Sequence, residues 1–186
     1  TITGNTNYGI YCSSSSPTIT NNTITGNGHG IYCEWSSSPT ITDNTISGNS
    51  GFGIDYRASS SGTITNNSIT GNSSHGIYCE NSSGIITNNT ITGNNYGVVC
   101  SSSAPIITNN QITGNSDQGI HCNASAPTIT NNTISGNSTH GIYSYNSSSP
   151  TIYNNIITEN GTTSTTYYGI YKNDGNPIID YNDVWG

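Results

Sequence analysis

The residues best suited to chemistry lie in and beside one short stretch, GFGIDYRASSSG, at residues 51–62. Other parts of the chain read GIYCE at the matching place, so Asp55 and Arg57 stand where those parts carry Tyr and Glu. Two carboxylates near a cation can act as general acid and base. The same residues can also form a surface salt-bridge ladder in which the arginine separates two glutamates, and we favour that interpretation. The candidate catalytic residues are Asp55, Arg57, Glu34 and Glu80.

A second group of candidates is aromatic and recurs at a regular spacing. A Tyr follows most copies of the Gly-Ile pair, and a Tyr, His or Phe often precedes it. Aromatic faces pack well on the C–H faces of sugar rings, so this pattern predicts a platform for a glycan. Tyr is also a common exposed residue of strands, which explains the pattern without any ligand. The candidate binding residues are Tyr11, Tyr32, Tyr78, Tyr143, Tyr171, Trp35, His29 and His75.

The composition excludes two classes of partner. The chain has two basic residues against nine acidic ones and a net charge of −7. Nucleic acids and anionic membranes are bound mainly through Lys and Arg, so we expect neither partner. No apolar run approaches the roughly 18 residues of a membrane-spanning helix, so we expect no membrane insertion. Cys and His do not cluster at metal-ligand spacings, so we expect no metal and no other cofactor.

A sequence repeat must position these candidates. Nearly the same sequence recurs every 21 to 23 residues from Thr18 to Pro150. Within the coil Thr18–Pro39, three short runs alternate inward Ile with outward Thr or Tyr, the period of a β-strand. Turns rich in Asn, Gly, Ser and Pro separate the runs. The pattern predicts an all-β parallel β-helix of about eight coils with three strands per coil. We expect residues 1–186 to form one domain, a fragment or processed part of a longer secreted chain.

Two columns of identical residues are expected to serve the scaffold. An inward Asn can bond the backbone of its own turn and the Asn of the next coil, so Asn ladders should fill the turns. The cysteines share one inward column, and their parallel side chains suit disulfides poorly, so we expect buried free thiols. The predicted structural residues are Asn22, Asn44, Asn67, Asn89, Asn110, Asn132, Asn155, Cys12, Cys33, Cys79, Cys100 and Cys122.

The pattern PTITNNTITGN…GIYC resembles the right-handed β-helix repeats of the pectin-lyase-like superfamily, in particular the CASH and NosD-like repeats. The resemblance implies a right-handed, single-stranded parallel β-helix whose GIYC runs form the first sheet, with any polysaccharide site outside that sheet. It also implies that a lyase or glycoside hydrolase would be centred on Asp55 and Arg57, and that only a lyase would need Ca²⁺. The Asp-Pro-His-Asp run of the β-helix epimerases and the paired aspartates of polygalacturonases are missing.

We therefore expect an extracellular or cell-surface rod that is structural or binds a polysaccharide, rather than an enzyme. Open solenoid ends favour end-to-end self-association. A second alternative is an ice-binding protein, since Thr-x-Thr pairs such as Thr18/Thr20 and Thr40/Thr42 could form a flat array. Thr is also a common exposed strand residue, and Ile85 and Ile106 interrupt the array.

Overall fold

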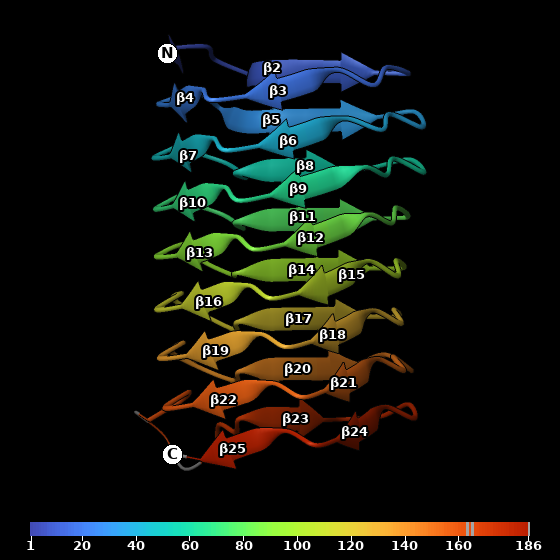
Figure 1. Ribbon diagram of the computed structural model, residues 1–186. Helices are drawn as coiled ribbons and strands as arrows, with labels where there is room; N and C mark the ends of the chain where they lie inside the picture. The colour runs from blue at the N-terminus through green and yellow to red at the C-terminus, as the bar shows by residue number, and fades with distance from the viewer. Residues whose placement is uncertain (163, 165, 186) are drawn as a thin grey trace.

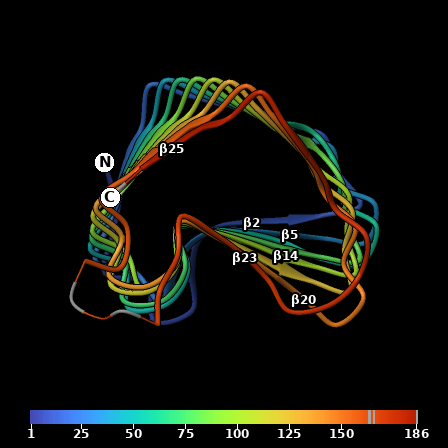
Figure 2. The same ribbon diagram turned by 90° about the horizontal axis from the view of Figure 1, so that it is seen from below.

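The computed structural model describes residues 1–162, 164 and 166–185, and it is a stack of parallel coils (Figure 1). Each coil contributes one short strand to each of three sheets, of eight, eight and nine strands. Every strand pairs in parallel with its equivalents in the coils above and below, as in Ile19↔Ile41 and Ile41↔Ile64. Seen along the axis, successive coils lie nearly on top of one another (Figure 2). The predicted parallel β-helix of about eight coils with three strands each is confirmed.

The first sheet is built from the GIYC runs and their equivalents. Its strands are β2 (Tyr8–Ser13), β5 (His29–Glu34), β8 (Ile54–Tyr56), β11 (Ile77–Glu80), β14 (Val98–Ser101), β17 (Ile120–Asn123), β20 (Ile142–Tyr145) and β23 (Ile170–Lys172). In β5 the buried Ile31 and Cys33 alternate with the half-buried Tyr32 and Glu34, as the period of two predicts.

The second and third sheets follow in each coil and are built from the Thr-Ile-Thr runs. The second sheet holds β3 (Thr18–Thr20), β6 (Thr40–Thr42), β9 (Thr63–Thr65), β12 (Ile85–Thr87), β15 (Ile106–Thr108), β18 (Thr128–Thr130), β21 (Thr151–Tyr153) and β24 (Ile178–Asp180). The third holds β1 (Ile2–Thr3), β4 (Thr23–Thr25), β7 (Thr45–Ser47), β10 (Ser68–Thr70), β13 (Thr90–Thr92), β16 (Gln111–Thr113), β19 (Thr133–Ser135), β22 (Ile156–Thr158) and β25 (Asp183–Trp185).

The core is a set of Ile ladders, with one buried Ile from each strand of a typical coil. Burying an Ile side chain removes enough apolar area to contribute roughly 2 to 3 kcal/mol. The cysteines lie in a second inward column of the first sheet, two residues after its Ile column, with Cys79 paired in register with Cys100 and Cys100 with Cys122. All five are buried and free, as predicted. Burial raises the pKa of Cys79 and of Cys122 to about 12, so these thiols stay protonated and unreactive.

In the coil Thr40–Gly62, Tyr56 interrupts the run of cysteines in this column, and its side chain is fully buried. A Pro precedes most strands of the second sheet. The strands β9 and β12 are instead preceded by Gly62 and Gly84, which lie beside Tyr56. A Cβ on Gly62 would lie 3.1 Å from the Tyr56 hydroxyl, and one on Gly84 would lie 3.4 Å from the Tyr56 ring. The two glycines therefore make room for the larger core side chain.

The Asn ladders satisfy the backbone where the chain turns from the second sheet to the third. In the middle of the first ladder, Asn89 Nδ2 donates to the carbonyls of Ile64 and Thr87 and to Asn110 Oδ1. Asn89 Oδ1 accepts from the backbone N–H and the Nδ2 of Asn67. The turns from the third sheet toward the first carry a second ladder, as between Asn94 and Asn115. The predicted ladders are confirmed.

Replacing Asn89 by Ala should lower the free energy of unfolding by about 2 to 4 kcal/mol, because it leaves buried donors and acceptors without partners. Chemical denaturation followed by circular dichroism measures the change. The control is Asn88→Gly, at an exposed position with a φ of 56°, which should change stability by about 0.5 kcal/mol or less. An equal effect of the two substitutions would contradict a structural role for the ladder.

Candidate functional site

The candidate site lies on the outer face of the first sheet, where β5, β8 and β11 run side by side. The register places Tyr32 beside Asp55 and Asp55 beside Tyr78, as the repeat predicts. Arg57 directly follows β8, and its backbone N–H bonds the carbonyl of Cys33 in the preceding coil. Three successive coils thus hold the acidic and basic candidates together with Tyr32 and Tyr78, whereas Tyr11, Tyr143 and Tyr171 lie on other strands of the same sheet.

Asp55 and Arg57 form a close ion pair at the centre of this face. Arg57 Nε lies 3.0 Å from Asp55 Oδ1 and 3.1 Å from Oδ2, and Arg57 Nη1 lies 2.8 Å from Glu80 Oε2. Asp55 was expected to point outward beside exposed tyrosines, yet its side chain is 0% exposed. Its burial raises the pKa of Asp55 to about 6, although the adjacent Arg57 acts in the opposite direction.

Aromatic rings surround the Arg57 guanidinium. Its Cζ lies 5.0 Å from the ring centroid of Tyr78, 5.9 Å from that of Phe52 and 6.0 Å from that of Tyr32. Cations over aromatic faces at these distances are attracted by the ring quadrupole. The ion pairs and the rings together hold the guanidinium in one place.

The predicted Glu34–Arg57–Glu80 ladder is wrong in one of its two contacts. Arg57 pairs with Asp55 and Glu80, whereas Glu34 accepts hydrogen bonds from the hydroxyls of Tyr11 and Tyr32. The Asp55 carboxylate lies two residues before Arg57 in the same coil and bonds its Nε, while Glu34 is engaged by the two tyrosine hydroxyls. Trp35 lies on the turn after β5 and is 61% exposed.

The aromatic candidates stack on one another along the axis. Phe52 and Tyr78 are stacked with centroids 5.2 Å apart and planes 9° apart, and Tyr143 and Tyr171 with 5.3 Å and 6°. Tyr145 was missed among the sequence candidates, although it shares a column with Glu34 and Glu80, and its ring lies 5.5 Å from that of Tyr143. Because the ring faces cover one another, the edges and hydroxyls are what such stacks offer to a ligand.

The histidines of this face are packed between the rings. His29 lies 4.9 Å from Phe52, and His75 lies 4.9 Å from both Phe52 and Tyr96, measured between ring centroids. His75 Nδ1 is buried without a hydrogen-bond partner. Burial lowers the pKa of His75 to about 4, and the positive charge of Arg57 adds to the effect. His75 is therefore uncharged at neutral pH.

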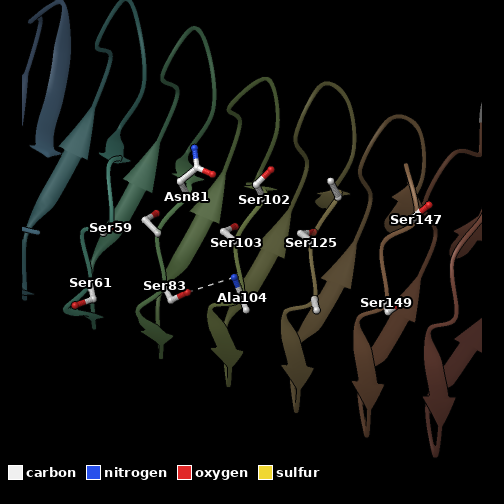
Figure 3. Close-up of a pocket in the computed structure, with 13 residues that line it drawn as sticks. Ser59, Ser61, Asn81, Ser83, Ser102, Ser103, Ala104, Ser125, Ser147 and Ser149 are labelled. Carbon is white, nitrogen blue, oxygen red and sulfur yellow. Dashed lines mark hydrogen bonds between the residues drawn. The ribbon is translucent and has the colours of Figure 1, made fainter. Parts of the chain in front are cut away.

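A serine-lined recess borders the first sheet where the chain turns toward the second sheet (Figure 3). It has a volume of about 810 Å³. The segments 57–62 and 145–150 have one residue more than the segments 80–84, 101–105 and 123–127 between them. The longer segments carry two consecutive residues of positive φ and form the ends of the recess, whereas the shorter ones carry one and form its floor. Only the segment lengths could have indicated this recess from the sequence.

Two absences can be stated for the part of the chain that the structure describes. No group of three or more His, Cys, Asp or Glu side chains there could hold a metal ion. No helix there has the length and apolarity needed to cross a membrane.

Replacing Asp55 by Asn should change how stability depends on pH. The pKa of Asp55 is about 6 in the folded chain and 3.8 as a free group, so its carboxyl favours folding most below pH 3.8 and loses that advantage as the pH rises through 6. The wild type should lose up to about 3 kcal/mol relative to Asp55→Asn between about pH 3.5 and pH 7. Denaturant titrations at several pH values measure the difference, and a pH-independent difference would contradict the burial of a titrating carboxyl.

Replacing His75 by Phe should change the pH dependence of stability in the opposite direction to Asp55→Asn. The pKa of His75 is lowered to about 4 from 6.5, so its neutral ring favours folding above pH 6.5 and that advantage is lost as the pH falls toward 4. The wild type should lose up to about 3 kcal/mol relative to His75→Phe over this range. Denaturant titrations at several pH values measure this difference in stability. The control is Tyr153→Phe on the second sheet, whose stability relative to the wild type should not change with pH in this way.

Comparisons with known proteins agree with this fold. The periplasmic alginate epimerase AlgG superposes with a TM-score of 0.90 at 18% identity, over 96% of this chain and 48% of that one. The A-module of the mannuronan C-5 epimerase AlgE6 from Azotobacter vinelandii superposes with a TM-score of 0.73 at 18% identity, over 91% and 61%. An alginate lyase from Paenibacillus sp. str. FPU-7 superposes with a TM-score of 0.60 at 14% identity, over 96% and 77%.

The chain spans about half the length of AlgG. At these identities the likeness concerns the fold alone. A search of curated protein sequences finds no match. The family described as the right handed beta helix region matches residues 1–127 and 105–186, and together these matches cover the whole chain. With the parallel coils and Asn ladders described above, they show that this chain belongs to the right-handed β-helix family.

Proposed function

We propose that this protein is a non-catalytic β-helix that binds a glycan along the outer face of its first sheet. The observation that carries the proposal is the continuity of the aromatic columns on that face. Stacked or tilted ring contacts run from Tyr8 and Tyr11 through Phe52 and Tyr78, and again from His121 to Tyr171. A polymer lying along the axis would meet at least one aromatic ring at every coil, about 4.8 Å apart, and tyrosine hydroxyls at most of the coils.

The comparisons support the same class of ligand. The three similar structures are named as proteins that act on alginate or mannuronan, which are polysaccharides. A glycan is therefore the ligand class that this fold is known to accommodate, and its place in this chain is our proposal. We place the protein outside the cytoplasm, in the periplasm or the extracellular space, because AlgG is described as periplasmic.

A lyase or hydrolase centred on Asp55 is the less favoured alternative. A general acid or base must reach the proton that it transfers. Asp55 has no exposed side-chain surface, and its oxygens are both bonded to Arg57 Nε. Arg57 is in turn engaged by Glu80. We propose that these residues hold the aromatic face in place and do not act on a substrate.

Ice binding is also less favoured. The register of the second sheet aligns Thr63 with Ile85, Ile85 with Ile106 and Ile106 with Thr128. Two adjacent coils in the middle of the array thus expose Ile where the array needs Thr. The exposed Tyr153 breaks the neighbouring column of the array, two coils beyond Ile106.

Replacing Tyr143 by Ala should weaken glycan binding about tenfold or more, because it removes a ring that stacks on both His140 and Tyr171. Affinity electrophoresis in gels containing a panel of polysaccharides measures the retention. The matched control is Tyr153→Ala, since Tyr153 is 43% exposed on the second sheet. Equal retention of the two variants and the wild type would overturn the assignment of the first sheet.

A further inference from the structure

We infer that the ligand of the first sheet is a neutral glycan and not a polyuronate such as alginate. The inference rests on the proposed function and narrows it. The similar structures act on alginate or mannuronan, so their ligands alone would suggest the opposite. The distribution of charges over the binding face of this chain disfavours a polyuronate.

The face offers almost no cation to an anionic chain. Arg57 and Lys172 are the two basic residues of the whole sequence. Arg57 is already bonded to two carboxylates, those of Asp55 and Glu80, and its Cζ lies within 6.0 Å of three ring centroids. Lys172 is exposed at the far end of the sheet, in β23, five coils from Arg57 and thus roughly 24 Å away at the usual strand spacing.

The histidines do not supply the missing charge. His29, His75, His121 and His140 lie on this face among the rings. Burial lowers the pKa of each of them from 6.5, so they are predominantly neutral at pH 7. A neutral imidazole can donate and accept hydrogen bonds with a hydroxyl but does not compensate a carboxylate.

The acidic groups would repel a polyuronate and suit a neutral sugar. Glu34 and Glu80 flank the Arg57 position, and Asp117 lies beside Gln118 on the turn that leads into β17. A polyuronate carries one carboxylate per sugar, and each would approach these groups without a free cation between them. The hydroxyls of a neutral sugar can donate hydrogen bonds to the same carboxylates, which are strong acceptors. They can also pair with the Tyr hydroxyls, which both donate and accept.

The test measures binding of the intact protein to two polyuronates, alginate and polygalacturonate, and to neutral xylan, mannan and β-glucan. Isothermal titration with soluble oligosaccharides of each is run at about 0.05 M and about 0.5 M NaCl, where the Debye length falls severalfold. We expect at least one neutral glycan to bind about tenfold or more tightly than either polyuronate at low salt. We expect its affinity to change by less than about twofold with salt.

The matched variant is Glu34→Gln, which keeps the shape of the side chain, removes one charge and leaves the Arg57 ion pairs intact. It should improve the affinity for polyuronates by roughly threefold to fivefold at low salt. The affinity for the neutral glycan should not improve, because an amide oxygen accepts a sugar hydroxyl less strongly than a carboxylate does. Tighter binding of a polyuronate that weakens with salt would overturn the inference and leave the proposed glycan-binding function standing. Absence of binding to either class would overturn both.

Discussion

Everything in this protein depends on successive coils lying in register, one residue directly above its equivalent. A ladder of Asn in the turn after the second sheet, and another in the turn after the third, enforce that register, because each amide bonds its own turn and the next coil at once. A shift of one residue would leave both ladders unpaired and would turn the Ile columns outward. The low charge of the chain follows from the same constraint, since identical charges stacked at about 4.8 Å would repel one another in every column.

Register also explains how a local departure can create a distinct surface. Tyr56 enters the core in place of a thiol, and Gly62 and Gly84 make room for it. On the outer side of the same strand, Asp55 replaces a tyrosine and is covered by Arg57. The arginine then fills the gap in the aromatic column with its contacts to Tyr32, Phe52 and Tyr78. Inner and outer faces of one coil thus changed together while the coils above and below kept the repeat.

Much of the fold could be predicted from the sequence, because the alternation typical of a β-strand recurs in every repeat. The strands, the Asn ladders and the inward thiols all follow from residue type and position within the repeat. The partners of Arg57 could not be predicted, since a long side chain can reach either neighbouring coil or its own strand. The burial of Asp55 and of His140, which is 7% exposed, was missed for a related reason. The alternation of a strand shows whether a side chain points inward or outward. It does not show whether neighbouring rings or an arginine will cover an outward side chain.

The central claim is that a glycan lies on the aromatic face of the first sheet, and NMR of tyrosine rings tests it most directly. With ¹³C-labelled tyrosine, a neutral oligosaccharide should shift the ring signals of Tyr32, Tyr78, Tyr143 and Tyr171. The signals of Tyr153 and Tyr181, which contact each other on the side of the second sheet, should stay in place. Shifts confined to Tyr153 and Tyr181, or no shift in any tyrosine when binding is measurable, would contradict the account.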